Sequence, residues 1–257
     1  MDKAPLTEHL GELRNRIVLS LITILVTFGA SFYFSEDLFR ILTAPLHNTV
    51  SFSIQSPYIS FHPGKFPDLK LIFIGPAEAV WMHIKMSFIS AFILSSPVIF
   101  YEIWKFIAPG LLEKERKYAI PFVFTTTFLF LLGSLFCFTI VLPFAMNFLL
   151  SYKTENLLPM ISVGKYIDFC LKFIISFGAI FELPVMMVFL TKMGVVTPEF
   201  LAKNRKYSVL IAFILAALLT PTPDAFNQTL MAIPIIILYE AGIWASKIMN
   251  RKKPAEE

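Results

Sequence analysis

A run of 35 residues without a charged side chain, residues 118–152, limits what this chain can fold into more than any other feature. About 20 apolar residues are enough for a helix to cross the hydrocarbon core of a bilayer. Across the chain 56% of residues are hydrophobic and 16% are charged, against about 25% charged in soluble domains. The sequence therefore excludes a soluble globular protein. It also lacks the polar–apolar alternation of an outer-membrane barrel, and it predicts an all-α integral membrane protein.

Six regions are apolar enough to be transmembrane helices, and together they predict that the whole chain, 1–257, is a single polytopic membrane domain. The expected spans are residues 17–35, 77–101, 118–142, 170–191, 207–220 and 225–245. We expect Pro143 to end the third helix, because proline removes a backbone donor. The fifth and sixth helices are expected to be short and to form a hairpin that thins the membrane locally.

The basic residues predict the orientation of the spans. Fifteen of the 22 lysines and arginines lie at the N-terminus, after the second and fourth spans and in the C-terminal tail. Because loops on the cytoplasmic side carry the excess of Lys and Arg, both termini are expected to be cytoplasmic. This distribution also accounts for the net charge of +4, so no nucleic-acid partner is implied.

The motifs of most enzymes are missing from the sequence. It contains no GxxxxGK[ST], GxGxxG, GxSxG or HExxH pattern, and no serine–histidine pattern at matching depths supports an intramembrane hydrolase. The four histidines are scattered, and Cys137 and Cys170 lack metal-site spacing, so they are expected to be small buried residues. We therefore expect no enzyme activity, no cofactor and no metal.

Carboxylates gather where the first helix and the first cytoplasmic loop begin. Residues 5–16 form an amphipathic pattern in which Glu12 lies four residues before Arg16, and a simple i,i+4 ion pair explains it adequately. Glu113 and Glu115 stand among basic residues in the loop, as solvated charge runs do. Two such carboxylate groups at one rim can also bind a cationic peptide, and bidentate pairing would then favour arginine over lysine.

Glu182 interrupts the fourth span near its centre, next to Leu183 and Pro184. A charge at that depth costs about 2.5–3.5 kcal/mol, so a functional or paired role is expected. Gln228 and Thr229 are its expected polar neighbours. From the residues alone, a proton-coupled secondary transporter that uses Glu182 explains the chain as well as a receptor does.

Two further acids have simple structural interpretations. Asp224 stands where it can cap the sixth helix. Glu240 lies within snorkelling distance of the cytoplasmic surface.

Several blocks, taken in order, resemble the TatC family of the twin-arginine protein translocase. The resemblance rests on His9-Leu-Gly-Glu-Leu-Arg14, Ala44-Pro-Leu46, Ser96-Pro-Val98, Trp104-Lys-Phe-Ile-Ala-Pro109, Glu115-Arg116, Phe177-Gly-Ala-Ile-Phe-Glu-Leu-Pro184, Leu219-Thr-Pro-Thr-Pro-Asp224, Gln228-Thr-Leu-Met-Ala-Ile-Pro234 and Tyr239-Glu240. Their order and spacing agree with six spans and cytoplasmic termini.

The resemblance implies a cup-shaped bundle whose cytoplasmic rim is a receptor for signal peptides with consecutive arginines. Glu12 and Glu115 match the carboxylates of the family's recognition site, and Phe106 adjoins that site. The residues Leu112-Glu113 stand where the family commonly has an aromatic and a basic residue, so Glu113 adds an acid beside Glu115.

The resemblance also implies a multimeric complex in the cytoplasmic (inner) membrane of a prokaryote. Glu182 would lie on the concave face within the membrane. Pro45 of the outer cap, with Asp224 and Gln228 near the outer turn of the short hairpin, would take part in assembly with single-span TatA- and TatB-type subunits. Folded cargo would cross at the expense of the proton-motive force. Residues 51–69 form a longer outer connection than is usual in the family.

Overall fold

Helices form nearly all of the structure, a computed structural model that describes residues 6–52, 59–63, 70–108, 119–151, 160–220 and 224–250. Five helical stretches in this part of the chain are long and apolar enough to cross a membrane. They are α1 (Leu6–Tyr33), α3 (Glu78–Ile107), α5 (Ala119–Phe136) continued by η2 (Cys137–Val141) and α6 (Leu142–Ser151), α7 (Val163–Phe181) continued by α8 (Leu183–Lys192), and α11 (Ala225–Asn250). The all-α integral membrane fold is confirmed.

The remaining elements are short. Helix α10 (Arg205–Leu219) has 15 residues, a length of roughly 22 Å, which is less than an average hydrocarbon core. The others are α2 (Ser35–His47), α9 (Pro198–Lys203) and the antiparallel strands β1 (Asn48–Phe52) and β2 (Ile59–Pro63). These strands were not predicted from the sequence. Helix α10 corresponds to the expected fifth span.

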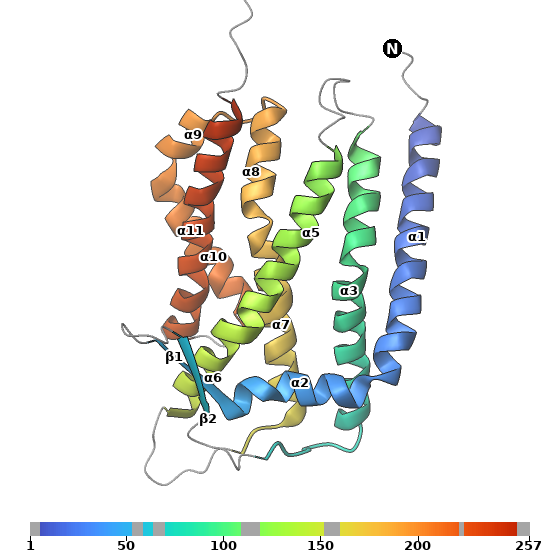
Figure 1. Ribbon diagram of the computed structural model, residues 1–257, viewed down its shortest axis with the longest axis vertical. Coiled ribbons are helices and arrows are strands. Elements are labelled where there is room, and N and C mark those ends of the chain that lie inside the picture. Colours follow the sequence, from blue (N-terminus) through green and yellow to red (C-terminus); the bar gives the residue numbers. More distant parts are fainter. Residues whose placement is uncertain are drawn as a thin grey trace, which may run out of the picture.

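Figure 1 shows how the helices are arranged. Helices α1 and α3 stand side by side, α5 crosses the molecule obliquely, and α8, α10 and α11 stand on the other side. The first turn of α1 and the last turn of α11 lie at the same end, which we call the termini end. Helix α2 and the two strands lie at the opposite end.

Pro143 does not end the third helix, so that expectation is wrong. The helix continues to Ser151. A π-helical turn, Cys137–Val141, comes directly before Leu142 and Pro143. A π-turn changes the local hydrogen-bond pattern, which allows a helix to continue past a residue that has no N–H. Leu142 and Pro143 are both buried, so packing also keeps this segment in the bundle.

The sixth helix is not short, which corrects a second expectation. Helix α11 has 26 residues and continues ten residues beyond Glu240. The Glu240 carboxylate accepts hydrogen bonds of 2.6 and 2.9 Å from Arg205 at the start of α10. This partner neutralises the charge of Glu240 within the longer helix.

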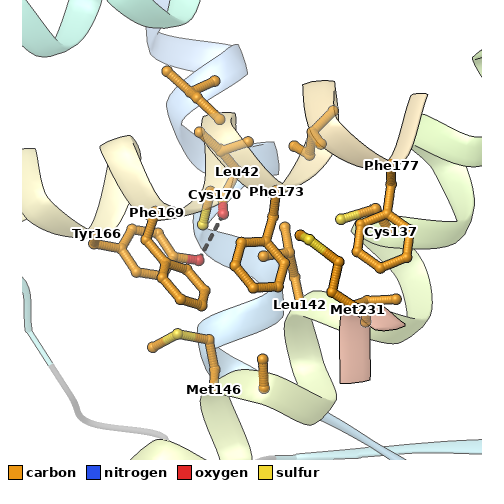
Figure 2. Packing of buried hydrophobic residues seen from close by; sticks show 14 of the residues in the cluster. Leu42, Cys137, Leu142, Met146, Tyr166, Phe169, Cys170, Phe173, Phe177 and Met231 are labelled. Carbon is orange, nitrogen blue, oxygen red and sulfur yellow. Dashed lines mark hydrogen bonds between the residues drawn. The ribbon is translucent and has the colours of Figure 1, made fainter. Parts of the chain in front are cut away.

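Aromatic side chains of α7 form the centre of the core (Figure 2). Tyr166, Phe169, Phe173 and Phe177 recur at helical spacing and are all buried, and Figure 2 shows them on one side of α7. The Tyr166 hydroxyl donates a 2.8 Å hydrogen bond to the carbonyl of Leu42, which attaches α2 to this core. Cys137 and Cys170 are buried and free of disulfides.

Glycine allows α5 and α7 to approach closely. A Cβ atom on Gly178 would lie 2.7 Å from the Phe130 ring and 2.8 Å from the Ser134 hydroxyl. Any larger residue at position 178 would therefore push the two helices apart.

Glu78 fastens the opposite end of the bundle. Its carboxylate accepts hydrogen bonds from the backbone N–H of Ile74 at 2.6 Å and of Gly164 at 2.8 Å, and from the Ser162 hydroxyl. Ile72 and Ser162 also form a parallel β-bridge. These contacts hold the first turns of α3 and α7 together.

Candidate functional site

Arg16 lies between two carboxylates near the termini end. Its Nη2 is 2.6 Å from Glu12 Oε1, one turn earlier on α1, and its Nη1 is 2.9 Å from Glu102 Oε2 on α3. The Glu102 side chain is only 5% exposed, whereas the Glu12 side chain is 36% exposed. One guanidinium thus joins a buried carboxylate of the bundle to a carboxylate that solvent can reach.

Helix geometry places Glu12 and Phe106 at the same level. Helices α1 and α3 run in opposite directions (Figure 1). Glu12 precedes Arg16 by four residues, and Phe106 follows Glu102 by four residues, so each lies one turn closer to the termini end than the Arg16–Glu102 pair. Phe106 is half-buried. The structure therefore brings these two predicted site residues onto neighbouring helices at one height.

Glu113 and Glu115, the other two predicted carboxylates of this site, lie outside the described residues. The described chain stops at Ala108 and resumes at Ala119. Ala108 follows α3, which runs toward the termini end, and Ala119 begins α5, which runs away from it (Figure 1).

An aromatic cluster anchors the last turns of α3 on the other side. Trp104 is buried, and its Nε1 donates a 3.2 Å hydrogen bond to the Thr126 hydroxyl of α5. Its ring stacks on Phe122 at 4.8 Å and meets Phe189 of α8 edge-on at 5.0 Å. The aromatic cluster packs the end of α3 against α5 and α8, and Arg16 joins it to α1. Glu12 and Phe106 therefore lie on rigidly held helices.

The arrangement is suited to binding a cation. A carboxylate can accept about four hydrogen bonds, and the Glu12 side chain is 36% exposed. Its exposed position at the end of two apolar helices would allow a guanidinium to reach it from solvent. No group of three or more His, Cys, Asp or Glu side chains within the described ranges could hold a metal ion.

Glu102 is the residue of this site that sequence reasoning missed. It directly follows the expected second span, 77–101, and it lies 86 residues from Arg16. The available signal was Arg16 itself, because an arginine at the start of an apolar helix needs more than one acceptor. Spacing along the chain could not identify Glu102 as the second one.

Glu182 lies at a break in the fourth span, as the neighbouring Pro184 had suggested. Helix α7 ends at Phe181 and α8 begins at Leu183. The Glu182 Oε1 atom is buried and has no hydrogen-bond partner among the described residues.

The polar neighbours expected for Glu182 do not bond to that oxygen, which corrects the prediction. Gln228 donates instead to the carbonyl of Phe213, at 3.1 Å, and the Thr229 hydroxyl donates to the carbonyl of Ala225, at 2.6 Å. Both side chains donate to backbone carbonyls within the α10–α11 hairpin. These acceptors are nearer to them than the Glu182 carboxylate is.

Asp224 caps α11. Its Oδ1 accepts a 2.7 Å hydrogen bond from the backbone N–H of Asn227, and its Oδ2 accepts one of 3.0 Å from the Asn227 side chain. The capping interpretation is confirmed. Gln228 follows in the same turn, while Pro45 is buried within α2.

Comparison with known proteins identifies the family. The profile described as "Sec-independent protein translocase protein (TatC)" matches residues 8–234. A Sec-independent protein translocase protein TatC from Desulforapulum autotrophicum is 42% identical over 100% of this chain and 89% of its own length. The TatC protein of Aquifex aeolicus is also 42% identical, over 97% of each chain.

A solved structure leads to the same conclusion. The crystal structure of a twin-arginine translocase receptor, TatC, superposes with a TM-score of 0.77 at 40% identity and covers 95% of this chain and 100% of its own. These relatives are named as parts of a protein translocase, which is a transport function and not catalysis. With its apolar helices and bacterial relatives, this is a multi-pass inner-membrane protein. The chain belongs to the TatC family of Sec-independent protein translocases.

Proposed function

We propose that this chain is the receptor subunit of a twin-arginine translocase and that it binds signal peptides with consecutive arginines at the termini end, on the cytoplasmic side. The observation that carries the proposal is the partly exposed Glu12 carboxylate, held by Arg16 against the buried Glu102. A solved relative with 40% identity is itself named a receptor.

Recognition would rest on the geometry of the guanidinium group. Its planar array of N–H donors pairs with a carboxylate through two parallel hydrogen bonds, whereas the ammonium of lysine is a point charge. Glu12 would bind one arginine, with Glu115 and Glu113 of the first cytoplasmic loop as the other carboxylates. Phe106, at the level of Glu12, would contact the apolar part of the peptide.

The remaining steps involve no covalent chemistry by this chain. We infer that TatA- and TatB-type single-span subunits assemble on it in a multimeric complex, through Pro45 and the region of Asp224 and Gln228. Folded cargo would then cross, driven by the proton-motive force. Glu182 would act within the membrane, because its buried Oε1 has no partner in the described part of the chain. The comparisons give the alternative, a proton-coupled transporter, no support.

The test is binding of a fluorescent twin-arginine signal peptide to the detergent-purified protein, with a twin-lysine peptide as the reference. We expect arginine-selective binding that Glu12→Ala and Glu115→Ala each weaken about tenfold, the value of one charge-assisted hydrogen bond. Glu113→Ala shows whether the extra acid contributes.

The matched control is Glu199→Ala. Glu199 is an exposed carboxylate in the first turn of α9, also at the termini end (Figure 1). Equal binding of both peptides, or the same loss in the control as in Glu12→Ala, would remove the mechanism proposed here.

A further inference from the structure

Two adjoining clefts lie on the bundle between α3 and α7. The first has a volume of about 570 Å³, and α1 forms its third wall with the apolar side chains Ile24, Leu25 and Phe28. The second has a volume of about 660 Å³ and lies toward the opposite end, beside the first turns of α3 and α7. Lys85 and Asp168 line both clefts, so the two clefts adjoin at this ion pair.

The charges in these clefts do not cancel. Asp168 receives both of its hydrogen bonds from Lys85, at 2.7 and 3.0 Å. Glu78 is bonded to Ile74, Gly75, Gly164 and Ser162. Lys165 and Lys172 are exposed, and neither forms an ion pair with another described residue. Lys85 and Asp168 cancel each other, and the donors to Glu78 are neutral, so the lining of the two clefts keeps a net charge of +1, with Lys165 and Lys172 as its unpaired cations.

The two unpaired lysines can serve one anionic group. Lys165, Asp168 and Lys172 follow one face of α7, since they are separated by three and four residues. Side chains in a helix tilt toward its N-terminus, and long lysines extend to the membrane surface. Lys165 lines the second cleft and Lys172 the first, about 10 Å apart along α7, so a ligand that touches both lysines lies across the junction of the two clefts.

The second cleft carries a residue typical of the lipid headgroup region. Trp81, one turn into α3, lines it and is 60% exposed, and exposed tryptophan is typical of the membrane–water interface. The first cleft, in contrast, is lined mainly by Ile, Leu and Phe side chains. A positive site at the interface that continues into an apolar channel matches a phospholipid.

We propose that these clefts bind an anionic phospholipid, with the phosphodiester headgroup between Lys165 and Lys172 and one acyl chain in the cleft between α1, α3 and α7. A lipid with a net negative headgroup is favoured over a zwitterionic one, because the lining of the two clefts keeps a net positive charge. The bound chain would fill the space beside α1, a helix that packs chiefly against α3.

The experiment is a lipid titration of the delipidated, detergent-purified full-length protein, followed by thermal unfolding. We expect phosphatidylglycerol to raise the melting temperature. Phosphatidylcholine with the same acyl chains and inorganic phosphate should raise it little. The double variant Lys165→Gln/Lys172→Gln should weaken the response to phosphatidylglycerol about tenfold or more.

The matched control is Lys203→Gln/Lys206→Gln, which removes two exposed lysines at the termini end and should respond as the parent does. Equal responses to the two phospholipids, or an unchanged response in the Lys165→Gln/Lys172→Gln variant, would overturn the proposal. A full response to inorganic phosphate would overturn it in favour of a free-anion site. None of these readouts depends on signal-peptide binding.

Discussion

Helix α3 carries an ion pair near each of its ends, and the two pairs differ in almost everything except distance. At the termini end, Glu102 is 2.9 Å from Arg16 and its side chain is 5% exposed. At the opposite end, Lys85 is 2.7 Å from Asp168, and both side chains are nearly half exposed. Burial, and not the separation of the charges, decides how much each pair contributes, because water screens the exposed one.

The difference matters most for α1. This helix is exposed over much of its surface, with Leu25 at 67% and Val26 at 69%. Among the described residues, its polar contacts with α3 include the Arg16–Glu102 pair and hydrogen bonds that join Thr27 to Ser95, at 2.7 Å, and to the carbonyl of Ala91, at 3.3 Å. The buried pair thus fixes the position of α1, and the exposed pair leaves its lysine able to move.

The largest expected effect comes from Glu102→Ala. It leaves the guanidinium of Arg16 with one partner in a largely buried position, which costs about 3 kcal/mol of unfolding free energy. Thermal unfolding in detergent measures this loss. Asp168→Ala is the reference at the other end of α3, and equal destabilisation by the two variants would contradict the comparison.

A moderate effect is expected on peptide binding. Glu102→Gln weakens the hold on Arg16, which then binds Glu12 more fully and competes with an incoming arginine. We expect about threefold weaker binding of the twin-arginine peptide in a fluorescence titration. Asp168→Asn should leave that affinity unchanged. If Asp168→Asn weakened binding as much as Glu102→Gln, recognition would not be confined to the termini end.

The smallest effect is expected for Asp168→Asn on stability, below about 1 kcal/mol. The loss of unfolding free energy caused by Asp168→Asn should become smaller as the salt concentration rises, since salt screens exposed charges over about 10 Å at 0.1 M. The cost of Glu102→Gln should change little over the same range. Melting temperatures of both variants at low and high salt provide the check, and a parallel salt response would mean that the two sites are equally exposed.

Local patterns in the sequence were read correctly, and long-range contacts were not. The Glu12–Arg16 pair follows from a four-residue spacing, and the capping of α11 by Asp224 follows from its place before an apolar helix. The break at Glu182 follows from Pro184. Glu102 remained hidden because its partner is 86 residues away.

The errors have a common physical origin. Pro143 was taken as a helix end, yet a π-turn directly before it lets the helix continue. The sixth helix was expected to be short, yet α11 continues past Glu240, whose carboxylate pairs with Arg205. The polar partners assigned to Glu182 were likewise claimed by nearer acceptors in the α10–α11 hairpin.

The π-turn at Cys137–Val141 sets the register of the third helix. A regular α-helix through these same residues, with none deleted, would rotate all of α6 by about 100° relative to α5. Leu142, Ala145 and Met146, now buried in the core, would turn toward the lipid. The five-residue turn therefore acts as a phase shift that lets two halves of one helix each present their own apolar face to the bundle.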